Sequence, residues 1–176
     1  YISLRRLEND ALFEETHGQM MLGMENVIQV SIGQFYGIEI NDFAVTVAKT
    51  ALWIAESQMM QETESLMQID LDFLPLKSYA NIVEGNALRV DWESVVPKDR
   101  LNYIMGNPPF VGKKEQTKSQ KEDIKFLFNA EKTKSGNLDY VSCWFYLASK
   151  FLQNYPSVKV AFVSTDSLCQ GEHVPA

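Results

Sequence analysis

The sequence predicts an α/β fold with a mostly parallel sheet and helices on both of its faces. Two observations lead to this prediction. Short apolar runs recur along the 176-residue chain, and segments with helical periodicity or long connections lie between them. Parallel strands require such crossovers and are usually buried between layers of helices. The length corresponds to one domain or to part of one.

The first half of the chain is expected to form two helices with a short strand between them. Residues 2–15 have helical spacing, and residues 35–40 are rich in strand-forming side chains. Asn41 or Asp42 then caps a helix that runs to about Gln61. The apolar residues expected to face inward are Leu4, Leu7, Ala11 and Leu12 in the first helix and Phe43, Val47, Ala51 and Ile54 in the second.

The second half continues the alternation of strands and helices. Residues 62–80 look irregular with some helix, whereas residues 81–84 and 101–105 predict short strands. Residues 139–154 predict a helix, and residues 158–163 predict a last strand. The helix carries an apolar stripe that we assign to the core, formed by Tyr140, Trp144, Leu147 and Phe151.

The turn Asn107-Pro108-Pro109-Phe110 follows the strand at residues 101–105 after a single glycine. Such a turn suits the methylation of a planar amino nitrogen, whose lone pair is delocalised into a base or an amide. The side-chain oxygen of Asn107 and the carbonyl of Pro108 can accept both amino hydrogens and favour a more nucleophilic, pyramidal nitrogen. The prolines stiffen the turn, and Phe110 offers a flat face for a base to stack on.

The alternative for these four residues is a rigid proline turn with Phe110 in the core. Paired prolines are common in turns. Asn, two prolines and an aromatic in that order, directly after an apolar strand, are not. We therefore favour the catalytic interpretation of this turn.

Two other strand ends carry candidate cofactor-binding residues, because ligands of parallel sheets bind at the carboxyl ends of the strands. Glu39 can accept hydrogen bonds from both hydroxyls of a ribose, and Ile40 can lie against an adenine. Asn86, followed by Ala87, can bond the exocyclic amine of that adenine. Both sites have structural alternatives. Glu39 can favour the positive end of the following helix, and Gly85-Asn86 can simply form a β-turn.

The charge distribution adds a nucleic-acid candidate. The net charge of −7 argues against a general nucleic-acid binder, but residues 113–134 hold seven lysines against four acidic residues. This segment directly follows the proline turn, so it could form a lid or a phosphate-contacting loop beside the active site, with Lys113, Lys114 and Lys118 as candidate contacts to nucleic acid. A solvated, mobile loop at residues 113–123 is the alternative, and the two interpretations are compatible.

Several classes of protein are disfavoured by the composition. Cys143 and Cys169 suggest neither a disulfide framework nor metal-ligand spacing, and with only His17 and His173 we expect no metal site. No apolar run is long enough to span a bilayer, and no signal peptide is recognisable. These features fit a cytoplasmic protein with no membrane partner.

The chain resembles the class I S-adenosylmethionine-dependent DNA adenine-N6 methyltransferases of bacterial restriction–modification systems, and is most similar to the MmeI-like group. The ordered matches are FYGIEIN to the ribose motif, VEGNALRVDW to the adenine motif and IMGNPPFVGKK to the catalytic motif. KVAFVSTDSLCQGEHV resembles the strand and loop that follow the catalytic region. The resemblance covers nearly the whole chain, and GNPPF is its most specific element.

This resemblance implies a Rossmann-like methyltransferase core that is incomplete at its N-terminal side. YISLRRLE looks like the helix after the family's Gly-rich cofactor loop, so we expect that loop and the first strand before residue 1. Residues 1–176 would then be a partial catalytic domain without the target-recognition and nuclease regions. Many relatives carry Asp where this chain has Asn86, which is a mild departure because Asn can also accept a hydrogen bond.

The implied reaction transfers the methyl group of S-adenosylmethionine directly to the N6 amine of an adenine flipped out of double-stranded DNA. Other regions of the same polypeptide are further expected partners, and the fragment alone is expected to be inactive. Two alternatives remain open. The acceptor could be a protein glutamine amide or an RNA base, or the chain could be a non-catalytic piece that serves subunit assembly.

Overall fold

The computed structural model describes residues 1–16, 28–67, 81–128 and 138–166, and the chain divides into two compact units. The first unit covers residues 1–87 and the second covers residues 88–176. Each unit contains one pair of parallel strands.

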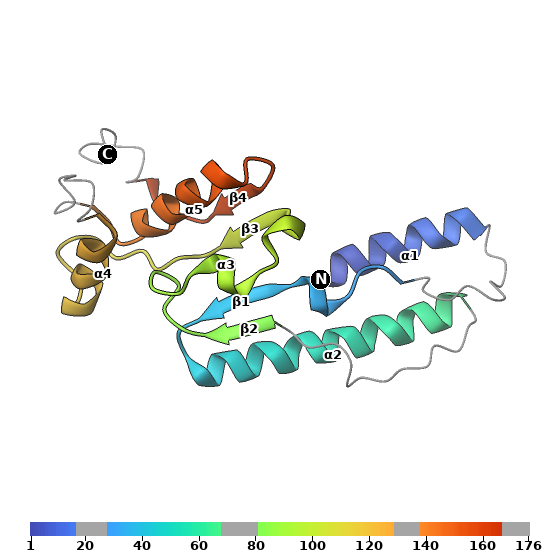
Figure 1. Ribbon diagram of the computed structural model, residues 1–176. Coiled ribbons are helices and arrows are strands. Elements are labelled where there is room, and N and C mark those ends of the chain that lie inside the picture. The colour runs from blue at the N-terminus through green and yellow to red at the C-terminus, as the bar shows by residue number, and fades with distance from the viewer. Residues whose placement is uncertain (17–27, 68–80, 129–137, 167–176) are drawn as a thin grey trace. The chain divides into compact units, whose positions relative to one another are not determined.

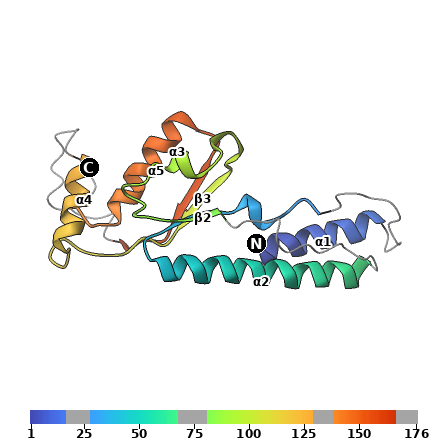
Figure 2. The same ribbon diagram turned by 60° about the horizontal axis from the view of Figure 1, so that its bottom comes forward.

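The first unit pairs two strands and packs them on a long helix. Its elements are α1 (Ile2–Thr16), the 3-10 helix η1 (Ile32–Gln34), β1 (Tyr36–Glu39), α2 (Asp42–Met67) and β2 (Asn81–Glu84). The strands β1 and β2 are parallel, with Tyr36 opposite Asn81 and Glu39 opposite Glu84. Helix α2 packs against both strands and lies beside α1, as Figures 1 and 2 show.

The start of α2 is set by capping side chains. The side-chain oxygen of Asn41 accepts the Ala44 N–H at 3.0 Å, and the carbonyl of Asn41 accepts the Val45 N–H at 2.9 Å. Such bonds satisfy donors that the first helical turn leaves unpaired. The predicted cap at Asn41 or Asp42 is therefore confirmed, and the helix extends past the expected end to Met67.

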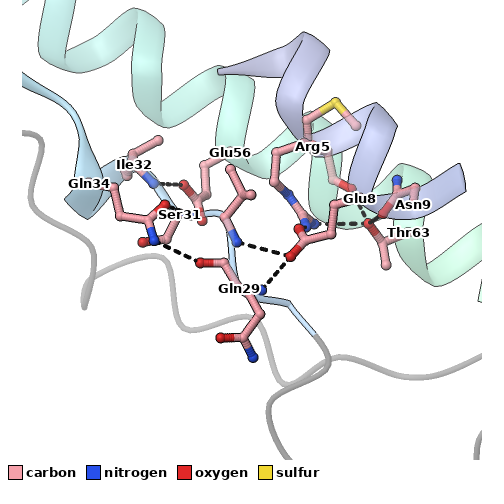
Figure 3. Close-up of polar contacts among 11 residues, drawn as sticks. Arg5, Glu8, Asn9, Gln29, Ser31, Ile32, Gln34, Glu56 and Thr63 are labelled. Atoms are coloured by element: carbon pink, nitrogen blue, oxygen red, sulfur yellow. Dashed lines mark hydrogen bonds and ion pairs between the residues drawn. The ribbon is translucent and has the colours of Figure 1, made fainter. Parts of the chain in front are cut away.

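A buried polar cluster, shown in Figure 3, joins α1, α2 and the segment before β1. Arg5 is fully buried, forms an ion pair with Glu8 and donates a 2.9 Å hydrogen bond to the hydroxyl of Thr63. Glu8 also accepts the backbone N–H groups of Gln29 at 2.6 Å and Val30 at 3.0 Å. These contacts fasten the segment that leads into β1 onto α1.

A second set of bonds fixes the same segment to α2 and β2. The carboxylate of Glu56 accepts the Ile32 N–H at 3.1 Å, and the side-chain amide of Asn81 donates to the Gly33 carbonyl at 2.9 Å. Glu56 is buried, so its carboxylate acts here as a fixed acceptor for the backbone. These bonds hold the segment just before β1 against α2 and β2.

The predicted inward faces of α1 and α2 are wrong except at Leu12, which is half-buried. Leu4, Leu7, Phe43, Val47 and Ile54 are exposed, and Ala11 and Ala51 are exposed as well. The buried positions of the two helices are instead Arg5, Asn9, Val45, Glu56, Met59, Thr63 and Met67. The error has a physical cause: the seam between the helices is partly polar, and hydrophobic periodicity cannot indicate a polar seam.

The second unit contains the other strand pair. Its elements are α3 (Trp92–Val95), the 3-10 helix η2 (Lys98–Arg100), β3 (Tyr103–Gly106), α4 (Lys118–Phe128), α5 (Ser142–Asn154) and β4 (Lys159–Phe162). The strands β3 and β4 are parallel, with Tyr103 opposite Lys159 and Gly106 opposite Phe162. Asp91 caps α3 by accepting the Glu93 N–H at 3.0 Å.

The core of the second unit forms between α4, the start of α5 and the segment at Leu88. Its buried members are Leu88, Ile124, Phe128, Leu138, Tyr140 and Cys143. The predicted core stripe of the last helix is confirmed, since Tyr140 and Phe151 are buried and Trp144 and Leu147 pack against the core. Phe145 of α5 contacts Phe162 of β4 edge to face, at 5.3 Å between ring centroids.

The four predicted strands are present with boundaries shifted by at most two residues. A second prediction fails: residues 113–123 were expected to form a loop, but α4 begins at Lys118. The side chains of Thr117 and Gln120 exchange hydrogen bonds with each other's backbone N–H groups, at 3.3 and 2.9 Å, and so cap this helix. The expected mixed α/β architecture with parallel strands is confirmed. Within the described residues the strands form two pairs, and the full Rossmann-like core stays a prediction.

Candidate active site

The catalytic candidates lie in a turn at the carboxyl end of β3. Pro108 is buried, whereas Asn107, Pro109 and Phe110 are exposed. The side chain of Asn107 makes no hydrogen bond to another described residue, so its oxygen can accept a donor from a ligand. Phe110 is 44% exposed, which excludes the alternative that it is a core residue in this structure.

Close packing favours the glycine before the turn. A Cβ atom at Gly106 would lie 3.2 and 3.3 Å from two ring carbons of Phe162 on the neighbouring strand. Such distances are shorter than ordinary van der Waals contact. The absence of a side chain at this position lets the Phe162 ring pack directly against the strand that carries Asn107.

The cofactor candidates lie side by side in the first unit. The strands β1 and β2 end together, because Glu39 lies opposite Glu84 and the Glu39 carbonyl accepts the Gly85 N–H at 2.9 Å. This bond brings Asn86 and Ala87 next to Glu39 and Ile40. Ile40 is 69% exposed, which is a large apolar surface at a strand end.

Glu39 also makes a contact at the start of α2, as the structural alternative for this residue predicts. One carboxylate oxygen accepts the Asn41 N–H at 3.1 Å, just before α2 begins. This bond orients the carboxylate and leaves further lone pairs on its two oxygens. A role at the helix start and a role in ribose binding are therefore compatible.

The lysine candidates lie near the catalytic turn along the chain. Lys113, Lys114 and Lys118 are all exposed. Sequence reasoning missed Lys121 and Lys125, which are exposed on α4 and share one side of it with Lys118 because they are three and seven residues further on. The spacing of these lysines could have placed them on one side of a helix, but only if the segment had been predicted to be helical.

Cys143 is unsuited to act as a nucleophile. It is fully buried, and burial raises the pKa of its thiol to about 12. The thiol therefore stays protonated at neutral pH, and a protonated thiol is a poor nucleophile. The other cysteine, Cys169, and both histidines, His17 and His173, lie outside the described residues.

The whole chain, residues 1–176, matches the family model described as MmeI, DNA-methyltransferase domain. The chain belongs to this family. The resemblance inferred from the three strand-end motifs is thereby confirmed at the level of the family.

Two relatives of this MmeI-family chain illustrate the match. It is 42% identical over 180 residues to DNA methyltransferase A of Bacillus subtilis (strain 168), covering 99% of this chain and 20% of the relative. It also matches a solved structure of the Type IIL restriction–modification enzyme MmeI in complex with DNA, with 39% identity and a TM-score of 0.90. That match covers 99% of this chain and 23% of the solved one. The chain thus spans about a fifth of the length of these relatives.

In the part of the chain that the structure describes, no helix is both long enough and apolar enough to cross a membrane. Among the same residues, no three His, Cys, Asp or Glu side chains gather in a way that could hold a metal ion.

Proposed function

We propose that this MmeI-family chain is part of a bacterial restriction–modification enzyme that methylates the N6 amine of adenine in DNA, with S-adenosylmethionine as the methyl donor. One observation carries the proposal. Asn107 is exposed at the carboxyl end of a parallel strand, in a stiff proline turn, and its side-chain oxygen is not used by another described residue. The family and the DNA-bound relative support the choice of substrate.

The turn would act by orienting the acceptor amine. The Asn107 side-chain oxygen and the Pro108 carbonyl accept its two hydrogens, while Phe110 stacks on the flipped base. S-adenosylmethionine supplies an electrophilic methyl group on a sulfonium sulfur. With the donor held there, the new N–C bond would form as the S–C bond breaks, and the amine would then lose one proton. Holding the two reactants in line supplies much of the acceleration.

The residues at the ends of β1 and β2 fit an adenosyl group. Glu39 provides charged acceptors for ribose hydroxyls, exposed Ile40 provides an apolar surface for the adenine, and Asn86 and Ala87 lie on the adjacent strand end. We propose that a Gly-rich loop elsewhere in the polypeptide holds the methionine end. We further propose that residues 1–176 form only part of the catalytic domain.

Identification of the methylated product tests the function. Full-length protein is incubated with duplex DNA, RNA and a mixture of proteins in the presence of isotopically labelled methyl donor. We expect the label to appear as N6-methyladenine after digestion of the DNA to nucleosides. Label on glutamine or on RNA, with none on adenine of DNA, would contradict the proposal.

Glu39→Gln is expected to weaken cofactor binding in the full-length protein and to leave DNA affinity nearly unchanged. Loss of a charged acceptor typically costs about 1.5–3 kcal/mol. Calorimetric titration with S-adenosylmethionine measures the change, and Glu15→Gln, an exposed position on α1, serves as the control. Equal cofactor affinity in Glu39→Gln and wild type would favour a purely structural role at the helix start.

Phe110→Tyr or Phe110→Trp should retain more DNA affinity than Phe110→Ala. Stacking of a base on an aromatic ring is worth about 1–3 kcal/mol and tolerates any flat ring. Because Phe110 is exposed, the alanine variant should lose little thermal stability. Binding to a duplex with a mismatch at the target adenine reports on the stacking. A large fall in melting temperature with unchanged affinity would refute the role.

The lysines after the turn should contact DNA phosphates. Lys118→Gln and Lys121→Gln are each expected to reduce the slope of log affinity against log salt by about 1, uniformly across DNA sequences. Lys49→Gln, an exposed lysine on α2, makes the same charge change and serves as the control. Identical slopes in all three variants and wild type would indicate a solvated surface.

A further inference from the structure

The Asn107–Phe110 turn is held at both ends by backbone hydrogen bonds. Before the turn, the Gly106 carbonyl accepts the Val163 N–H at 3.0 Å. After it, the Val111 carbonyl accepts the Tyr140 N–H at 2.9 Å. Two prolines restrict the residues between these points. The position of the Asn107 oxygen therefore depends on both anchors.

The second anchor rests on a buried glutamine. The side-chain nitrogen of Gln116 donates to the Leu138 carbonyl at 2.8 Å and lies 3.4 Å from the Val111 carbonyl. Gln116 is 7% exposed, although glutamine is mostly a surface residue. Its amide thus links the residue after Phe110 to the backbone that leads into Tyr140.

Tyr140 is fixed in turn by a buried carboxylate. Its hydroxyl donates to one oxygen of Asp123 at 2.7 Å, and the Arg89 Nε–H donates to the other oxygen at 2.7 Å. Asp123 is 6% exposed, so both bonds form with little competition from water. Burial, and next the bond to Asp123, raise the pKa of Tyr140 well above its usual value, which keeps the hydroxyl a donor at neutral pH.

These contacts form one connected path to the catalytic turn. Arg89 and Asp123 hold the Tyr140 side chain, the Tyr140 backbone holds Val111, and Val111 adjoins Phe110. The Arg89 guanidinium also lies over the Phe126 ring, 4.1 Å from its centroid, which fixes the far end of the path on α4. All of these residues belong to the second unit.

We infer that Gln116, Asp123 and Tyr140 are positioning residues that hold Asn107 and Phe110 in their reacting geometry. None of the three needs to touch the substrate. The inference rests on the proposed function, because the property it affects is the rate of methyl transfer. A displacement of reacting groups by about 1 Å can cost about 100-fold in rate.

The test uses the full-length protein and two variants that break the path at different points. Tyr140→Phe removes only the hydroxyl that bonds Asp123, and Gln116→Met removes the amide while keeping a side chain of similar length. Tyr155→Phe and Gln58→Met make the same chemical changes outside the path. We expect kcat to fall by about 10- to 100-fold in the two path variants. The KM value for the cofactor should stay within about twofold, and both controls should match wild type.

Separate measurements of kcat and of melting temperature distinguish a positioning role from a purely structural one. A variant with lowered melting temperature and unchanged kcat, assayed where it is fully folded, would overturn the inference for that residue. If Tyr140→Phe fails to fold, the same comparison on Gln116→Met decides the inference for the path. If wild-type protein does not methylate DNA, the proposed function is contradicted instead. The positioning role is then decided by the ratio of variant to wild-type kcat on whichever acceptor the wild-type protein methylates.

Discussion

Asn107→Ala should lower methyl transfer by the full-length protein at least about 100-fold, while folding and cofactor affinity stay close to wild type. Removal of one preorganised polar group at a reacting centre typically costs about 100- to 1,000-fold in kcat. The stability cost should be small, because the Asn107 side chain is exposed and makes no hydrogen bond to other described residues. Single-turnover methylation of duplex DNA measures the rate.

Two further variants make the Asn107 test specific. Asn102→Ala removes the same side chain from an exposed position just before β3 and should leave the rate unchanged. Asn107→Asp keeps oxygen acceptors and should retain more activity than Asn107→Ala. Activity of Asn107→Ala within a few-fold of wild type would refute the assignment of this residue to the acceptor amine.

Glu8→Gln should destabilise the first unit by about 3–5 kcal/mol, which is the usual cost of removing one partner from a buried ion pair. The variant leaves the fully buried Arg5 guanidinium without its carboxylate. Hydrogen exchange of peptides from α1 and residues 28–34 in the full-length protein measures the local opening free energy. Glu15→Gln, exposed on the same helix, should change it by less than about 0.5 kcal/mol.

A second substitution separates the ion pair from the hydrogen bonds of Glu8. Adding Arg5→Met to Glu8→Gln removes the unpaired charge, while the glutamine oxygen can still accept the Gln29 and Val30 N–H groups. The double variant should therefore be more stable than Glu8→Gln alone. If the two changes are simply additive, the buried charge is not the source of the cost.

The sequence predicted the strands well because each is a short apolar run that ends in glycine or a polar residue. These same boundaries located Glu39, Asn86 and Asn107 at strand ends, which is where the structure has them. Whether these side chains bind cofactor or base is a property of the complex, and it stays a prediction.

The helical faces and α4 were harder to predict, for two different reasons. The α1–α2 seam buries Arg5, Glu56 and Thr63, which bond residues far away in sequence, so periodicity pointed to the wrong face. Helix α4 was obscured by its lysines, although Thr117-Lys118-Ser119-Gln120 carries the pattern of a reciprocal helix cap. This local pattern predicts a helix in place of the expected loop.

The strands β1 and β3 are each hydrogen-bonded to a single neighbouring strand within the described residues. The other side of each strand therefore presents a row of backbone donors and acceptors. In a longer polypeptide such rows can be satisfied by another strand of the same chain. We expect residues 1–176, taken alone, to pair such rows with a second molecule. Their folded state would then depend on mass action, with a melting temperature that rises with protein concentration.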